Sequence, residues 1–189
     1  DGSNNSGLKS VGVPGTVAGL YLAHQKYGEL PWKELIQPAI NLAKQGVVLS
    51  YTLAKHAKNI LASDKPEFLK NYYRNADGEL TQHGELWVQP ELAKTLKYIR
   101  DKGRDGFYKG AVAQEIAAFM EANGGLITLA DLSKYEAVER KPLTGTYKDY
   151  EILSMPPPSS GGVAIIEMLN MMEQANLDSV PFNSTEYVH

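Results

Sequence analysis

The sequence contains no cysteine, and this absence excludes several kinds of site. A disulfide framework, a thiol nucleophile and every zinc site with sulfur ligands require that residue. The absence of cysteine does not identify the cellular compartment, because proteins without disulfides occur in the cytosol, the periplasm and the medium. The sequence also lacks any run of about 18 apolar residues, so it offers no candidate for a membrane-spanning helix.

A block of basic residues is missing as well. The formal net charge is -3 and the sequence pI is about 5.8. Lysines and arginines alternate with acidic residues, which is typical of a solvated surface and unsuited to a polyanion. We therefore expect no nucleic-acid partner. The 189 residues, 43% hydrophobic and 22% charged, are ordinary for a globular chain of one domain.

Helical periodicity dominates the sequence. Apolar residues recur three and four positions apart, between prolines or capping residues at the start and glycines at the end. Pro38 predicts a kink or a restart in the second helix. The expected helices cover residues 14–28, 31–46, 50–62, 90–103, 110–122 and a segment that follows residue 162. We expect the last two to bury Val112, Ile116 and Phe119, and Val163, Ile166, Leu169 and Met172, respectively.

The end of the chain has a different period. Residues 138–147 and 150–155 predict two strands joined at Lys148 and Asp149 as a β-hairpin. Thr128 and Asp131 resemble a capping box, and Asn183 to His189 resemble a helix cap and a first turn. The predicted fold class is α+β, mainly helical, with one short β-hairpin near the C-terminal end. We expect a helical region over 1–135 and a hairpin, loop and helix over 136–189, in a single compact unit.

The sequence identifies no side chain as a catalyst or as a metal ligand. The four histidines are His24, His56, His83 and His189, and no two of them stand three or four residues apart. Most acidic residues lie beside Lys or Arg, as expected of an exposed surface. We assign no chemistry to either group and expect no metal.

Two glycine-containing segments have alternative interpretations. Residues 13–19 combine small residues with a helix start, which favours close packing, although free N–H groups there could bind an anion. Residues 156–162, Pro-Pro-Pro-Ser-Ser-Gly-Gly, suit either a rigid connector into a helix or a loop that binds a polar or anionic group. Ser159 or Ser160 as a nucleophile is disfavoured, because no neighbouring residue in the sequence offers a base.

Residues 154–162, Ser-Met-Pro-Pro-Pro-Ser-Ser-Gly-Gly, resemble a signature of the γ-glutamyltranspeptidase family. Other segments resemble that family in the same order and at similar spacing, across nearly the whole chain. These are Val13 to Gly19 with Lys26-Tyr27-Gly28, Phe107 to Gly110, Asn123 to Thr128, Asp131-Leu132 and Tyr135 to Val138.

The resemblance implies an N-terminal-nucleophile hydrolase, made as one precursor that cuts itself into a large and a small subunit. The new N-terminal Thr of the small subunit would attack the γ-glutamyl amide of glutathione. The γ-glutamyl group would pass to water or to an acceptor amino acid or peptide. The resemblance implies no cofactor, and places the protein in the periplasm or outside the cell. The present chain would be the helical lobe of the large subunit, with the small subunit as its partner.

The boundaries of the match decide which residues carry over. The Arg that grips the substrate carboxylate belongs upstream of Asp1, and the Thr and the oxyanion-hole glycines belong downstream of Gly162. We therefore assign no catalytic, substrate-binding or metal residue to this chain, and expect it to be an inactive scaffold, truncated at both ends. Gly161 and Gly162 are not taken as the oxyanion pair.

Two other interpretations remain open at this stage. Relatives of the family include β-lactam side-chain acylases and poly-γ-glutamate transpeptidases, and the scaffold region discriminates poorly between them. A non-catalytic helical interaction module is the alternative from another functional class.

Overall fold

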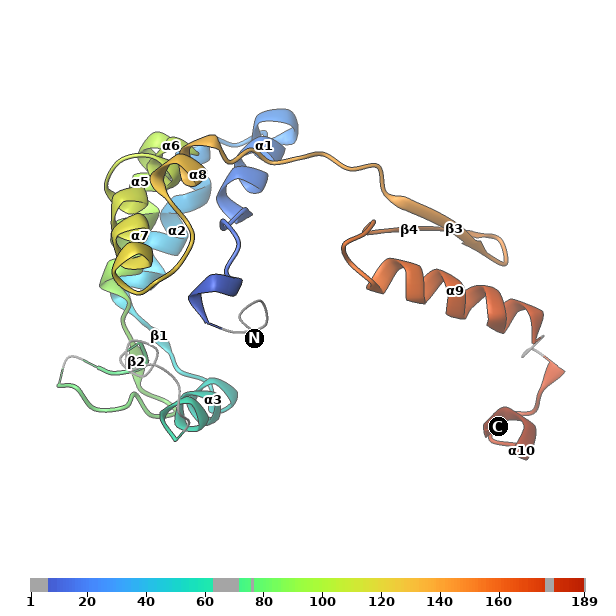
Figure 1. Ribbon diagram of the computed structural model, residues 1–189. Helices are drawn as coiled ribbons and strands as arrows, with labels where there is room; N and C mark the ends of the chain where they lie inside the picture. Colours follow the sequence, from blue (N-terminus) through green and yellow to red (C-terminus); the bar gives the residue numbers. More distant parts are fainter. Residues whose placement is uncertain (1–6, 63–71, 76, 176–178, 189) are drawn as a thin grey trace. The chain divides into compact units, whose positions relative to one another are not determined.

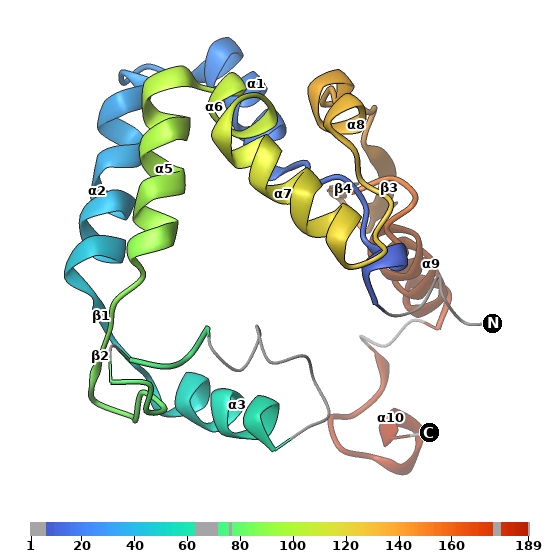
Figure 2. The same cartoon turned by 60° about the vertical axis from the view of Figure 1, so that its left-hand side comes forward.

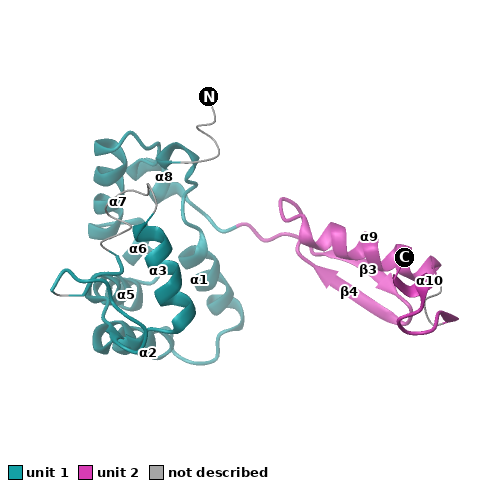
Figure 3. Ribbon diagram, turned by 90° about the horizontal axis from the view of Figure 1, so that it is seen from below, with its two compact units in different colours: residues 1–137 teal, residues 138–189 magenta. Residues whose placement is uncertain are grey.

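A computed structural model describes residues 7–62, 72–75, 77–175 and 179–188 (Figure 1). The chain forms two compact units, Asp1–Ala137 and Val138–His189 (Figure 3). The sequence led us to expect one compact unit, with its two regions meeting at 135/136; that division stays a prediction for the intact protein. In the described part of the chain, no helix has the length and apolar character to cross a bilayer.

Unit 1 is built from helices, as the periodicity predicts. α2 and α5 lie side by side, and α6 and α7 continue from α5 (Figures 1 and 2). The short α6 and the 3-10 helix η1 were not predicted, because one turn is too short to show a period. The elements are η1 (Leu8–Ser10), α1 (Thr16–Tyr27), α2 (Trp32–Gln45), α3 (Tyr51–Leu61), α5 (Pro90–Lys102), α6 (Asp105–Tyr108), α7 (Ala111–Ala122) and α8 (Leu129–Lys134).

Two predicted helix starts are confirmed by their capping bonds. The Ser50 hydroxyl accepts a hydrogen bond from the Leu53 N–H at 3.3 Å, which caps α3. At α8, the Asp131 N–H donates to the Thr128 hydroxyl at 3.2 Å, and the Thr128 N–H donates to the Asp131 carboxylate at 2.9 Å. The bonds from the Thr128 hydroxyl and backbone N–H hold the pKa of Asp131 below its usual value.

Pro38 does not divide the second helix. α2 runs as one element through this residue, so of the two expected outcomes, a kink or a restart, the restart is not found. Pro38 is exposed, which lets water satisfy the carbonyl that the proline ring leaves without its usual N–H partner. The opposite side of α2 is held against α5, where the Trp32 indole N–H donates to the Ile99 carbonyl at 2.9 Å.

A two-stranded antiparallel pair, absent from the sequence prediction, joins distant parts of unit 1. β1 (Val47–Val48) pairs with β2 (Leu86–Trp87), with Val47 opposite Trp87. Strands of two residues show no alternation, so the sequence could not reveal them. The pair closes the excursion that contains α3, and Leu49, directly after β1, is fully buried.

Unit 2 contains the predicted hairpin, and α9 (Gly161–Gln174) packs along it (Figure 1). β3 (Leu143–Tyr147) and β4 (Tyr150–Ser154) pair with Leu143 opposite Ser154. The first strand therefore begins at Leu143, and its expected start at residue 138 is wrong. The residue before β3, Pro142, has no N–H to donate to the other strand, so the pairing cannot continue through it. β4 ends at Ser154, where the chain leaves the sheet. The predicted final turn is α10 (Thr185–Val188); His189 lies outside the described residues.

Two predicted helix faces are only partly correct. In α7, Val112 is buried, but Phe119 is 40% exposed and its neighbour Met120 is buried instead. In α9, Ile166 and Leu169 are half-buried, whereas Val163 and Met172 are exposed. A shift of one residue turns a helical side chain by about 100°, so a face estimated from sequence is uncertain by one position.

Candidate functional site

Most of the segments that carry the family resemblance meet in the core of unit 1. All of them except 26–28 and 154–162 contribute a buried or half-buried side chain to one cluster. Its buried members are Ala18, Tyr108, Ala113, Met120, Ile127 and Leu132, and Val13, Val17, Phe107, Tyr135 and Ala137 pack against them. The motifs in this unit therefore have a packing role, and no local sequence pattern predicts that they converge.

Tyr108 lies at the centre of this cluster and is 1% exposed. Its hydroxyl donates a hydrogen bond to the Pro14 carbonyl at 2.5 Å and accepts one from the Ala18 N–H at 3.3 Å. The residue before α1 is Gly15, which has no side chain to cap the helix. Tyr108 therefore supplies that cap from 90 residues away in sequence. Burial raises the pKa of its hydroxyl, which stays protonated and able to donate.

The absence of a side chain at position 15 is explained by Tyr135, the second tyrosine of the cluster. The rings of Tyr108 and Tyr135 stack with centroids 5.4 Å apart and an interplanar angle of 12°. A Cβ atom on Gly15 would overlap the Tyr135 hydroxyl. The small residues of segment 13–19 thus serve close packing, which is the interpretation that the sequence favoured over an anion site.

Arg104 fixes the chain where it leaves α8. Its Nη2 donates to the backbone carbonyls of Ser133, at 3.2 Å, and Tyr135, and its Nη1 pairs with Asp105 at 3.2 Å. The guanidinium carbon lies 5.0 Å from the centre of the Tyr108 ring. The pKa of Asp105 is lowered, chiefly by the hydrogen bond from Lys109 at 3.0 Å and also by Arg104.

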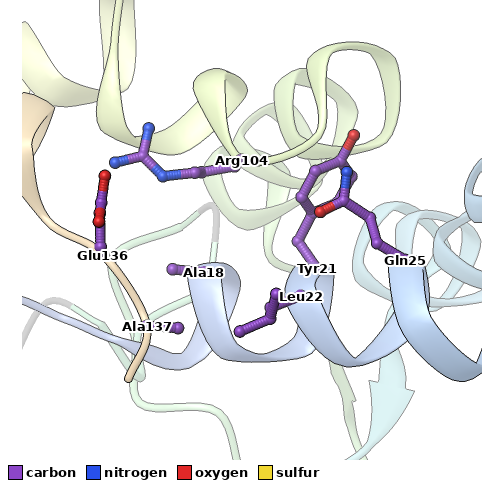
Figure 4. A pocket seen from close by; sticks show the side chains of 7 residues that line it. All are labelled: Ala18, Tyr21, Leu22, Gln25, Arg104, Glu136 and Ala137. Carbon is purple, nitrogen blue, oxygen red and sulfur yellow. The ribbon is translucent and has the colours of Figure 1, made fainter. Parts of the chain in front are cut away.

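A pocket of about 250 Å³ opens beside these residues (Figure 4). One stripe of α1 forms one wall, and Arg104 and the extended segment after α8 form the other. The lining residues are Ala18, Tyr21, Leu22, Gln25, Arg104, Glu136 and Ala137. The pocket lies wholly within unit 1, and sequence reasoning missed it because its residues come from three separate segments.

The loop 156–162 is a tight connector into α9. The Ser159 N–H donates to the Pro156 carbonyl at 3.3 Å, and both serine side chains are exposed. Among the described residues, no base contacts either hydroxyl. Gly162 is buried, and a Cβ there would lie 2.5 Å from the Met155 carbonyl oxygen, so its role is close packing of α9 on β4.

The described histidines have packing or hydrogen-bonding partners and do not converge. His24 Nε2 lies 2.8 Å from the Leu30 carbonyl oxygen, while His56 and His83 contact tyrosine rings. Within residues 7–62, 72–75, 77–175 and 179–188, no three His, Asp or Glu side chains are placed to hold a metal ion.

Comparison with known proteins gives matches over the whole chain. Residues 1–189 match the sequence model of a family described as gamma-glutamyltranspeptidase. A glutathione hydrolase proenzyme of Escherichia coli (strain K12) is 43% identical over 180 residues, covering 93% of this chain and 30% of that protein. An acylase ACY 1 proenzyme of Pseudomonas sp. (strain SE83) is 38% identical, covering 100% of this chain and 34% of that protein.

A solved structure has the same fold. The crystal structure of Helicobacter pylori gamma-glutamyltranspeptidase matches with a TM-score of 0.89 and 40% sequence identity, covering 100% of this chain and 54% of that chain. The expected fold class, a mainly helical part of an N-terminal-nucleophile hydrolase, is confirmed by this match. The present chain spans about a third of the length of the curated relatives that it matches.

Proposed function

Because this chain belongs to the γ-glutamyltranspeptidase family, we propose that it is part of an enzyme that cleaves the γ-glutamyl amide of glutathione. The observation that supports the proposal is a match along all 189 residues to that family. The alternative of a non-catalytic module has no comparable support.

The proposed reaction uses groups outside this chain. A Thr at the start of the small subunit attacks the γ-glutamyl amide carbonyl, and its own α-amino group takes the hydroxyl proton. The amide C–N bond breaks, the amine leaves with a proton, and the γ-glutamyl group stays as an ester on the Thr. Water or the amino group of an acceptor then attacks that ester and frees the Thr.

The chain contributes scaffold to this enzyme. Its motif residues in unit 1 pack around Tyr108, and the serines of the 156–162 loop contact no base in the described part of the chain. We propose that no residue here contacts the reacting atoms. The partner is the small subunit of the same precursor, and the location is the periplasm or the medium.

The test is an assay of the intact protein that contains this chain. We expect release of the coloured amine from a γ-glutamyl anilide, and faster release when a dipeptide acceptor is added. We expect no release from the 189-residue chain alone, because it lacks the nucleophile. The measured quantity is the initial rate at saturating anilide.

One result would indicate a different substrate for the enzyme, and another would contradict its enzymatic function. An intact protein that cuts itself into two subunits but releases nothing from the anilide would belong with the acylases, which the 38% identity to ACY 1 makes the natural second assay. An intact protein that neither cuts itself nor releases amine would contradict the enzymatic function.

A further inference from the structure

The pocket beside Tyr108 presents one positive and one negative side chain that do not pair with each other. Arg104 forms its ion pair with Asp105 at 3.2 Å. Glu136 also lines the pocket, and it has no ion pair or hydrogen bond with any residue in the described part of the chain. Figure 4 shows the guanidinium and the carboxylate on the same side of the pocket, facing each other.

Arg104 is held in place before any ligand arrives. Its Nη2 bonds to two backbone carbonyls, the Tyr108 ring covers one of its faces, and its side chain is only 24% exposed. Its Nε–H has no partner among the described residues. A fixed guanidinium with an unused donor is well suited to a carboxylate, because little side-chain freedom is lost on binding.

Glu136 lies between two residues that are packed against the core of unit 1. Tyr135 and Ala137 pack against the core cluster, and the Tyr135 carbonyl is bound by Arg104. The side chains of Glu136 and Ala137 both line the pocket, with Glu136 beside Arg104 (Figure 4). The Glu136 carboxylate, which is acceptor-only when ionised, therefore offers its oxygens to a donor such as an ammonium group.

The rest of the pocket separates apolar from polar surface. Ala18, Leu22 and Ala137 present apolar side chains, and Tyr21 and Gln25 lie farther along the same face of α1 (Figure 4). Spacings of three and four residues place these α1 side chains on one face of the helix. The pocket can thus accept a small side chain beside the two charged groups.

The local charges favour a ligand with both signs. Among the residues that line the pocket, Arg104 is the cation and Glu136 the carboxylate, so a ligand that carries both signs can pair with each of them. We propose that the pocket binds a zwitterionic α-amino acid, with its carboxylate on Arg104 and its ammonium group on Glu136. The proposal does not depend on the proposed reaction.

The test uses the intact protein with ¹³C-labelled alanine and leucine methyl groups, followed by NMR. The methyl signals of Leu22 and Ala137 report this pocket itself, so a ligand bound at another site is not mistaken for one bound here. We expect L-leucine to shift both signals to saturation. Acetate carries only the negative charge and methylammonium only the positive charge. At the same concentration, neither should shift the two methyl signals.

A pair of variants separates the proposed contact from a general charge effect. Glu136→Gln should raise the Kd for L-leucine at least about tenfold, because a charge-assisted bond is lost. Glu34→Gln, which changes an exposed carboxylate of α2 outside the pocket, should leave the Kd unchanged. The proposal is wrong if Leu22 and Ala137 do not respond, if acetate alone shifts them equally, or if Glu136→Gln binds like the parent.

Discussion

The Gly106→Ala variant is expected to unfold at a clearly lower urea concentration than the parent chain. Gly106 is buried in α6, against the last turns of α5. A Cβ there would overlap the Tyr98 carbonyl group and lie 2.9 Å from the Ile99 backbone nitrogen. Backbone atoms of a packed helix cannot move aside as a flexible side chain does, so we expect a loss of about 3 kcal/mol in the free energy of unfolding.

The measurement is urea unfolding followed by tryptophan fluorescence. The chain has two tryptophans, Trp32 and Trp87, and both lie in unit 1. The Trp32 indole bonds to the Ile99 carbonyl at 2.9 Å, so it reports the region that the substitution disturbs.

Gly19→Ala is the matched control for this substitution. Gly19 lies inside α1, and a Cβ there would meet nothing within 4 Å. Replacing a helical glycine by alanine in open space should stabilise the chain by about 0.5–1 kcal/mol. Equal losses in both variants, or no loss in Gly106→Ala, would contradict the close approach of α5 and α6.

Tyr108→Ala is the second substitution for which we expect a large effect. The change removes a ring that is 1% exposed and stacked on Tyr135, and leaves a cavity in the core. Loss of a buried aromatic side chain costs about 3–5 kcal/mol, and the lost hydroxyl bonds add to this. We expect the chain to be largely unfolded in mild urea, measured by the same fluorescence.

Tyr108→Phe isolates the contribution of the hydroxyl. The ring stays, but the Ala18 N–H and the Pro14 carbonyl lose the partner that they share. An unsatisfied buried polar group costs about 1–3 kcal/mol, so this variant should fall between the parent and Tyr108→Ala. Unfolding at the parent's urea midpoint would show that the hydroxyl does not cap α1.

Local sequence signals predicted much of this fold. Ser50 and Thr128 identified the starts of α3 and α8, and the turn at Lys148 and Asp149 identified the hairpin. These features depend on residues within a few positions of each other. α6 and the β1–β2 pair were missed, because elements of two to four residues have no measurable period.

The pocket and the convergence of the motifs could not be predicted, for a different reason. The bond between Tyr108 and Ala18 joins residues that are 90 positions apart, and nothing in either local sequence indicates it. In the sequence, nothing distinguishes Glu136 from the other residues of the segment Tyr135 to Val138, which resembles the family. Only the fold shows that its side chain lines a pocket beside Arg104 (Figure 4).

The central claim is that this chain is scaffold and that the chemistry belongs to other parts of the intact enzyme. Its most direct test is the rate of γ-glutamyl anilide cleavage by the intact protein with Ser159→Ala and Ser160→Ala together. Both side chains are exposed, and Ser160 makes no capping bond to α9, so the fold should be unchanged. We predict a rate within about threefold of the parent, since neither hydroxyl acts as a nucleophile. Loss of activity by about a thousandfold, in a folded and normally cut protein, would contradict the account, because a loss that large indicates removal of a reacting group.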